Sequence, residues 1–295
     1  MTAELVAPTP VVGTLSPSRA AEFKTCPLRY RLRNIDRLPE TPSPAAVRGT
    51  LVHAVLDELY DLPPDQRTPA AAEAILPGAW AHLLESEPGL GELFATSTEA
   101  EAWLASARPL LASYFRLEDP ATLEPVWRER YVEVAIGDVR LRGVLDRLDV
   151  GADGDVRIVD YKTGASPLLA HEGAALFQLK FYALLLWRTR GVVPGQLRLI
   201  YLTDTTTLTY CPDADELAGF ERTVLAVWDA IRLALVTGDF RPSPGRACQW
   251  CDYRTLCPAL GGTPPPYPYP ARLTDPRDDA ADAAGPDQTD SSDAR

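Results

Sequence analysis

The segment from residue 126 to residue 162 most constrains the fold, because its apolar and polar residues alternate as they do in β-strands. Three strands are expected here, over Val126–Ile136, Val139–Val150 and Val156–Lys162. Between them lie Gly137-Asp138 and Gly151–Gly154, whose glycine and aspartate residues favour tight turns. The segment therefore predicts a three-stranded meander.

Apolar residues recur at helical spacing on both sides of this meander. Helices are expected over residues 16–32, 45–60, 70–87, 98–116, 174–190 and 216–237, with a fourth strand over residues 197–203. This order of elements indicates an α/β fold, with a central mixed β-sheet flanked by helices. We expect one domain over residues 15–260, with a helical insertion at about residues 61–120. A flexible lead over residues 1–14 and a Pro-rich, acidic, disordered tail over residues 261–295 would flank it.

The two expected turns predict which residues face each other across the meander. A two-residue turn at Gly137-Asp138 would bring Glu129 opposite Asp146, and a second turn centred on residue 153 would bring Asp146 opposite Asp160. Lys162 lies two residues after Asp160, so the two side chains share a face. The sequence thus predicts one sheet face that carries three carboxylates and a lysine.

Carboxylates crowded among apolar neighbours repel one another and resist loss of solvent, and a hard divalent cation removes both costs. Carboxylate oxygens suit Mg²⁺ or Mn²⁺. Such an ion can lower the pKa of a water molecule and hold a phosphate oxygen, and Lys162 could position that water or stabilise developing charge. The alternative is a surface ion pair between Asp160 and Lys162, with Asp146 paired to Arg147 or Arg142.

Four sequence segments resemble the motifs of one nuclease family. Gly143–Asp149, followed by Val159–Gly164, resembles the core of the PD-(D/E)XK nuclease superfamily, and more narrowly that of the RecB-like exonucleases. Gly49–His53 resembles the G-x-x-x-H element of that family, and Gln178–Tyr182 resembles its Q-x-x-x-Y element. The resemblance covers residues 15–258. It implies a restriction-endonuclease-like sheet, with a helical region before it and the cysteine segment after it.

The resemblance implies roles for individual residues. Asp146 and Asp160 would ligate Mg²⁺ or Mn²⁺, and Lys162 would be the catalytic lysine. His53 and the backbone carbonyl of Tyr161 would be additional metal ligands. The alternative for His53 is a half-exposed histidine on a helix.

Three further positions are weaker candidates. Gln178 and Tyr182 lie four residues apart on one helix face, and would orient the lysine or contact the DNA backbone. Their alternative role is packing in the core. Glu129 is a candidate metal ligand on the strand-register argument, and Glu133 on the same strand is its rival.

The cysteines suggest a second metal centre. Cys26 lies near the start of the domain, and three cysteines with C-x2-C-x5-C spacing lie near its end, namely Cys248, Cys251 and Cys257. Four thiolates suit either zinc or an iron–sulfur cluster. Here the chain is similar to the iron–sulfur nucleases, such as the nuclease domain of the AddB-type helicase and the CRISPR-adaptation exonucleases. That similarity implies a structural [4Fe–4S] cluster, with Zn²⁺ or plain buried thiols as alternatives. The fifth cysteine, Cys211, is expected to be a small core residue.

The net charge of −12 argues against nucleic acid as a partner, because phosphate binding relies on Lys and Arg. The charge is unevenly distributed, however, since residues 16–48 carry a net +4 and residues 274–295 a net −5. Candidate DNA-binding residues in the basic part are Arg19, Lys24, Arg29, Tyr30, Arg31 and Arg33. They could follow a single strand by charge and stacking, or they could be an ordinary solvated helix face.

The sequence contains no apolar run of about 18 residues and no basic-then-apolar leader, so we expect a cytoplasmic protein without a membrane span. The resemblance implies a metal-dependent DNA exonuclease of repair or recombination, acting on single strands or ends without sequence specificity. A helicase partner is also implied. The alternative is a non-catalytic DNA-binding or assembly module that retains the fold and the cluster. The set of Asp146, Asp160 and Lys162 argues against this alternative.

Overall fold

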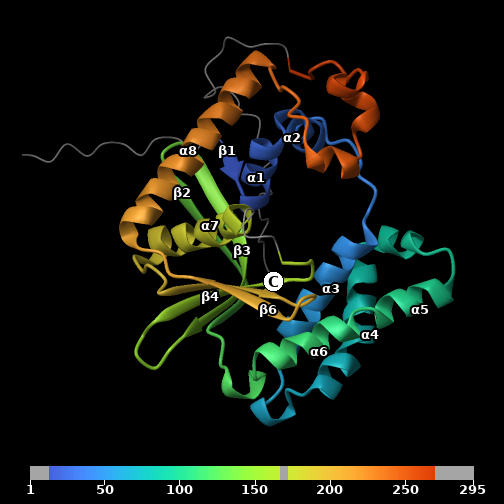
Figure 1. Cartoon of the computed structure of the whole chain (residues 1–295), viewed down its shortest axis with the longest axis vertical. Helices are drawn as coiled ribbons and strands as arrows, with labels where there is room; N and C mark the ends of the chain where they lie inside the picture. The colour runs from blue at the N-terminus through green and yellow to red at the C-terminus, as the bar shows by residue number, and fades with distance from the viewer. Residues whose placement is uncertain (1–12, 167–171, 270–295) are drawn as a thin grey trace, which may run out of the picture. The chain divides into compact units, whose positions relative to one another are not determined.

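The structure is a computed structural model that describes residues 13–166 and 172–269 (Figure 1). The chain divides into two compact units. Unit 1 comprises Met1–Asp36, Val134–Leu141 and Leu225–Arg295, and unit 2 comprises Arg37–Glu133 and Arg142–Val224. Most of the predicted lead and the acidic part of the predicted tail lie outside the described residues. No helix among the described residues is both long and apolar enough to cross a membrane.

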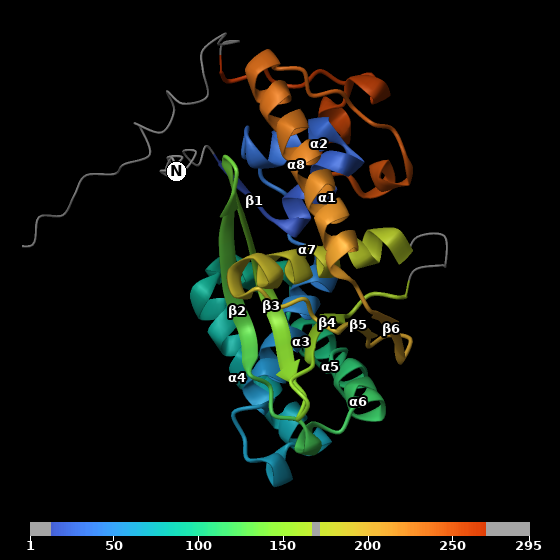
Figure 2. The same cartoon turned by 90° about the vertical axis from the view of Figure 1, so that its left-hand side faces the viewer.

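The described residues form one mixed sheet of six strands, and the predicted α/β class with a sheet flanked by helices is confirmed. The strands are β1 (Gly13–Leu15), β2 (Trp127–Ile136), β3 (Val139–Val150), β4 (Val156–Lys162), β5 (Gln196–Tyr201) and β6 (Thr206–Tyr210). Their order is β1-β3-β4-β5-β6, and β2 also pairs with β3. Figure 2 shows β2 and β3 side by side as a long hairpin. The sequence prediction missed β1 and β6.

Strands β3 and β4 are antiparallel, with Arg147 opposite Val159 and Val150 opposite Val156. This is the predicted register. One residue beyond the Arg147–Val159 pair, the same register brings Asp146 opposite Asp160. Strand β4 is parallel to β5, and β5 is antiparallel to β6. The parallel pairing of β4 with β5 requires a crossover, which contains helix α7 (Glu172–Arg190).

Four helices of unit 2 precede the meander, namely α3 (Pro44–Leu59), α4 (Pro69–Ser86), α5 (Ser97–Ala105) and α6 (Arg108–Leu117). Side chains of α3, α4 and α6 form a buried apolar cluster with Val159 and Tyr161 of β4 and Ile200 of β5. These helices therefore cover the sheet face that carries Tyr161. The prediction of one helix over residues 98–116 is wrong. A separate helix α6 begins at Arg108, with Pro109 in its first turn, where the missing N–H of proline costs no helical hydrogen bond.

Helix α7 packs against strands β4 and β5 of unit 2, and it lies apart from helices α3–α6 (Figure 1). A Cβ atom at Gly143 on β3 would lie 2.8 Å from a ring carbon of Tyr182 on α7. Only a residue without a side chain therefore allows α7 this close to β3. The close packing places the polar residues of α7 beside the ends of β3 and β4.

Unit 1 contains the N-terminal helices α1 (Pro17–Thr25) and α2 (Pro27–Asn34), separated by Cys26. Cys26 has an extended backbone, so the expected helix over residues 16–32 is interrupted there. Helix α8 (Ala214–Thr237) has its C-terminal part in unit 1, where the indole of Trp228 donates to Asp138 at 3.1 Å. After α8, Cys248 lies in a short 3-10 helix (Arg246–Trp250), Cys251 follows that helix, and Cys257 lies between two further 3-10 turns (Arg254–Leu256 and Pro258–Leu260).

Candidate active site

Three side chains from separate elements of unit 2 converge at one point. His53 of α3 lies with its Nδ1 3.4 Å from Asp146 Oδ2 and 3.6 Å from Glu129 Oε1. One possible ligand atom from each of the three residues lies within 4.8 Å of the other two. The expected approach of Glu129 to Asp146 is therefore observed. Its rival Glu133 instead accepts a hydrogen bond from the exposed Tyr131 at 2.6 Å.

Glu129 reaches this position through an unusual backbone conformation. Its φ angle of 40° lies in the left-handed region that residues other than glycine rarely adopt. Such a residue interrupts the regular alternation of a strand and redirects its side chain. The candidate site therefore contains one of the three non-glycine residues with positive φ among the described residues.

The next strand, β4, contributes Asp160, Tyr161 and Lys162. Asp160 is 1% exposed, and its Oδ1 has no hydrogen-bond partner among the described residues. Its Oδ2 forms an ion pair with the ammonium of Lys162 at 2.5 Å. Buried polar atoms without hydrogen bonds are costly, so the Asp160 oxygens are suited to a cation. Asp160 does not join the group of three converging ligand atoms.

The main chain of Tyr161 holds two of the converging residues. Its N–H donates to Asp146 Oδ2 at 2.9 Å, and its carbonyl lies 2.9 Å from His53 Nε2. With Nε2 protonated and donating to this carbonyl, the His53 ring presents Nδ1 to the carboxylates. A ligand histidine commonly has its second nitrogen fixed in this way.

The charges of the site shift the protonation of its members. Burial raises the pKa of Asp146, and the neighbouring Asp160 carboxylate raises it further, to about 7. Burial lowers the pKa of His53, but the carboxylates of Glu129, Asp146 and Asp160 outweigh burial and raise it to about 9. Without a cation the site thus retains protons to offset its carboxylates, and a divalent ion would take their place.

Lys162 is held by helix α7. Its ammonium donates to Gln178 Oε1 at 2.8 Å, and Gln178 Nε2 donates to the Tyr182 hydroxyl at 2.7 Å. Burial raises the pKa of Tyr182, so its hydroxyl stays neutral. Tyr182 thus fixes Gln178, which fixes the lysine, in the arrangement expected of an orienting pair.

The site opens into a cleft of about 640 Å³ within unit 2. Its lining includes His53, Glu129, Asp146, Asp160, Lys162 and Gln178. On the helix side, a Cβ atom at Gly49 would lie 3.0 Å from the Thr163 hydroxyl, so this glycine allows α3 close to the end of β4. The cleft gives a substrate access to the charged groups.

Asp146 does not pair with Arg147, which was one of the two arginines considered as its alternative partner. The Arg147 side chain lies on the other side of β3, fully buried among tyrosine hydroxyls and carboxylates. The sequence analysis missed this network. The available signal was a charged residue in a strand whose neighbours Leu145 and Leu148 are apolar.

The four predicted cluster cysteines come together in unit 1, around a cavity of about 40 Å³. Cys26 Sγ accepts from the Ser243 N–H at 3.5 Å, and Cys248 Sγ accepts from the Gly245 N–H at 3.3 Å. Burial raises the pKa of the Cys251 thiol. Among the described residues, no three cysteine sulfurs all lie within 4.8 Å of one another. The prediction for the fifth cysteine is wrong, because Cys211 is exposed.

The candidate DNA-binding residues of α1 and α2 do not form one open face. Tyr30 is 4% exposed and Arg31 is 5% exposed, so both are removed from the surface. Arg31 pairs with Asp36 at 3.1 Å and donates to the Pro265 carbonyl at 2.6 Å. Arg29 and Arg33 both pair with Glu22, at 3.3 and 3.4 Å. Of the six, Lys24 and Arg33 are exposed, and Arg19 and Arg29 are half-buried.

The fold and the site define a nuclease, and comparison with known proteins assigns its family. The family model described as the PD-(D/E)XK nuclease superfamily matches residues 14–258, so the chain belongs to this superfamily. The gene 69 protein of Mycobacterium phage D29 is 24% identical over an alignment of 275 positions, and the match covers 83% of this chain and 96% of that protein.

A solved structure has a similar fold. The crystal structure of the "putative exonuclease" from Eubacterium rectale superposes with a TM-score of 0.54 at 14% sequence identity. The match covers 81% of this chain and 87% of the other. Membership of the superfamily makes the chain a nuclease, whose chemistry is hydrolysis of phosphodiester bonds.

Proposed function

We propose that the protein is a metal-dependent exonuclease that degrades DNA from single-stranded regions or ends, in DNA repair or recombination. The observation that carries the proposal is Asp160, a buried carboxylate with one oxygen paired to Lys162 and the other without a hydrogen-bond partner among the described residues, beside the cluster of His53, Glu129 and Asp146. The name of the Eubacterium rectale structure supports the exonuclease assignment. A helicase partner remains a prediction from the sequence resemblance.

The residues present fit a hard divalent cation, because they supply carboxylate oxygens, one imidazole nitrogen and a main-chain carbonyl. Asp146, Asp160, Glu129, His53 and the Tyr161 carbonyl would hold it. When bound, such an ion supplies a water molecule of lowered pKa and neutralises charge on the phosphate.

The side chains of the chain itself would do the rest. Lys162 is held by Gln178 and lies beside Asp160, so its ammonium can orient an attacking water or stabilise negative charge that develops on a phosphate oxygen. The bond from Tyr182 to Gln178 keeps the lysine in one orientation before the substrate arrives. The surrounding cleft would admit one DNA strand to these groups.

Cleavage of labelled DNA in the presence of Mg²⁺ or Mn²⁺ tests the proposal. We expect Asp160→Asn and Lys162→Met to remove activity, and Glu133→Gln to leave it unchanged as a control on the same sheet. A linear single strand labelled at either end, compared with a circular single strand of the same sequence, distinguishes removal from ends from internal cutting. Full activity of D160N would contradict the assigned site. Cutting of the circle would contradict the exonuclease assignment alone. Binding of DNA without cleavage by the wild-type protein would favour the non-catalytic module.

We propose in addition that Cys26, Cys248, Cys251 and Cys257 hold a structural [4Fe–4S] cluster in unit 1. All four line one cavity, and main-chain N–H groups donate to two of the sulfurs, as is common around clusters. A single zinc ion with Zn–S bonds of ~2.3 Å would hold its four sulfurs about 3.8 Å apart. Among the described residues no three of these sulfurs lie within 4.8 Å of one another, so they are not arranged as such a zinc tetrahedron.

Metal and sulfide analysis of anaerobically purified protein tests the cluster. We expect iron and inorganic sulfide in equal amounts, with the visible absorption of an iron–sulfur chromophore, and loss of both in Cys26→Ser. Cys211→Ser is the matched control, because the exposed Cys211 does not line the cavity. One equivalent of zinc without sulfide would establish the zinc alternative.

A further inference from the structure

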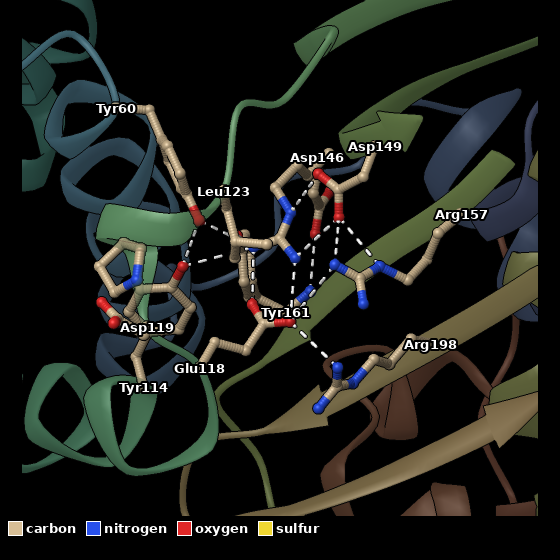
Figure 3. Close-up of polar contacts among 12 residues, drawn as sticks. Tyr60, Tyr114, Glu118, Asp119, Leu123, Asp146, Asp149, Arg157, Tyr161 and Arg198 are labelled. Atoms are coloured by element: carbon tan, nitrogen blue, oxygen red, sulfur yellow. Dashed lines mark hydrogen bonds and ion pairs between the residues drawn. The ribbon is translucent and has the colours of Figure 1, made fainter. Parts of the chain in front are cut away.

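Arg147 is adjacent to Asp146 on β3, but its guanidinium lies in the buried core on the other side of the strand. Figure 3 labels Tyr60, Tyr114, Glu118, Asp149 and Tyr161 of this core and draws polar contacts among them and their neighbours. The guanidinium donates to the hydroxyls of Tyr60, Tyr114 and Tyr161 and to the carboxylates of Glu118 and Asp149. One buried cation thus contacts residues from α3, α6, β3 and β4 within unit 2.

The charge of Arg147 is well compensated. It forms two bonds to Glu118, at 2.8 and 3.0 Å, and one to Asp149 at 3.1 Å. Arg198 lies 3.2 Å from Glu118, and Arg157 lies 2.7 Å from Asp149, so each carboxylate has a second guanidinium partner. Arg147 Nε has no hydrogen bond among the described residues, but it lies 3.1 Å from Asp149 Oδ1. A buried cation held by several charge-assisted bonds keeps its neighbours in a defined geometry.

One contact leads directly to the candidate metal site. Arg147 Nη1 donates to the Tyr161 hydroxyl at 2.7 Å. The main chain of the same tyrosine donates to Asp146 at 2.9 Å and accepts from His53 at 2.9 Å. The Tyr161 side chain is therefore held by Arg147, while its main chain holds two of the converging residues. The contact links the buried core to the orientation of the ligands.

A second contact links Arg147 to the helix that carries His53. Arg147 Nη1 also donates to the hydroxyl of Tyr60, at 3.1 Å, and Tyr60 is the residue that ends α3. The Tyr60 hydroxyl is in turn hydrogen-bonded to that of Tyr114 on α6. The guanidinium therefore links β3, β4 and α3, which are the three elements that present Asp146, the Tyr161 main chain and His53.

We propose that Arg147 is a positioning residue for the metal site, acting through Tyr161 and Tyr60 without touching the metal or the substrate. The inference rests on the proposed function, since it concerns the affinity of that site for a divalent cation. Loss of a residue that orients metal ligands typically weakens metal binding by about 10- to 100-fold. Arg147→Lys keeps the charge, but an ammonium cannot reach several hydroxyls and carboxylates in fixed directions.

The experiment measures Mn²⁺ affinity by calorimetry on the full chain without DNA, together with amide hydrogen exchange of the metal-free protein. In R147K we expect Mn²⁺ binding to weaken by about 10- to 100-fold. We also expect exchange of the Tyr161 amide, which donates to Asp146, to increase by about tenfold more than exchange of the core amide of Leu199 on β5. Arg198→Lys is the matched control, because it alters the same ion-pair network without contacting Tyr161 or Tyr60. There we expect Mn²⁺ affinity within about twofold of the wild type.

Two results would overturn the proposal. The first is R147K with wild-type Mn²⁺ affinity and unchanged exchange at Tyr161. The second is equal weakening of Mn²⁺ binding in R147K and R198K, which would indicate a general loss of stability. If R147K does not fold, Tyr161→Phe removes only the hydroxyl that Arg147 contacts, and unchanged Mn²⁺ affinity in that variant contradicts the proposal. If the wild-type protein bound no Mn²⁺, the proposed function would fail, whereas the exchange of the Tyr161 amide would still decide whether Arg147 holds that residue.

Discussion

Replacing Asp146 by Asn should stabilise the metal-free protein at high pH, although it removes a candidate ligand. Burial and the Asp160 charge raise the pKa of Asp146 from 3.8 to about 7. The folded protein therefore holds a proton that the unfolded chain releases above about pH 4. The contribution of this group to folding is fully present below pH 3.8 and is lost as the pH rises to about 7.

The size of the loss follows from the size of the pKa shift. A shift of about 3 units corresponds to about 4 kcal/mol, since each unit is worth about 1.4 kcal/mol. Asparagine avoids this cost, and its amide oxygen can still accept the N–H of Tyr161. It loses, however, the ion pair with His53, whose Nδ1 lies 3.4 Å from Asp146. We therefore expect D146N to be more stable than the wild type by about 1 to 3 kcal/mol at about pH 8.

Urea unfolding in EDTA at a series of pH values measures this difference. The advantage of D146N should shrink as the pH falls from about 7 and vanish below about pH 3, where Asp146 is protonated in both states. In saturating Mn²⁺ the order should reverse, because the wild type alone retains the full ligand set. Glu133→Gln on β2 controls for the loss of a carboxylate outside the site. A D146N protein that is no more stable than the wild type at pH 8, or whose advantage is independent of pH, would refute the reasoning.

Three further predictions concern the same site. The rise in melting temperature on adding Mn²⁺ should be larger at about pH 8.5 than at about pH 5.5, because the ion displaces protons from Asp146 and His53. Differential scanning fluorimetry measures this rise, and a rise that does not depend on pH would contradict the prediction. Gln178→Leu should lower kcat by about 10- to 100-fold with little change in Mn²⁺ affinity, because Lys162 loses its acceptor, and single-turnover cleavage kinetics test it. Gly143→Ala should cost about 1 to 3 kcal/mol in urea unfolding, because the new methyl group would meet Tyr182.

The register of β3 with β4 was predictable from the sequence, because local turn chemistry and alternation determine it. The residues Gly151–Gly154 fix where the chain reverses, and the alternation on either side fixes which residues face each other. The approach of Asp146 to Asp160 followed from these two facts alone. The contact from Lys162 to Gln178 was expected only as one of two roles. Its geometry depends on how α7 packs against the strands, which no local pattern specifies.

The failures share a physical cause, which is that the deciding partner lies far away in the sequence. Arg31 and Tyr30 were assigned to a DNA-binding surface, but Arg31 meets a main-chain carbonyl of Pro265, 234 residues away. Cys211 was expected in the core on composition alone, and it is exposed. The short strand β6 (Thr206–Tyr210) has five residues and only one neighbour, so its pattern was too weak to recognise.

The two sides of β3 and β4 specify the same register. On one side, Asp146, Asp160 and Lys162 belong to the candidate site, and on the other, Arg147 and Tyr161 belong to the buried network. A slip of one residue in either strand would exchange these sets, since side chains alternate between the faces. A slipped β3 would bring the Arg147 cation to the place of a metal ligand and the Asp146 carboxylate into a core that contains Glu118. Both exchanges are strongly unfavourable, so the alternation of charge between neighbouring residues stabilises the pairing that builds the site.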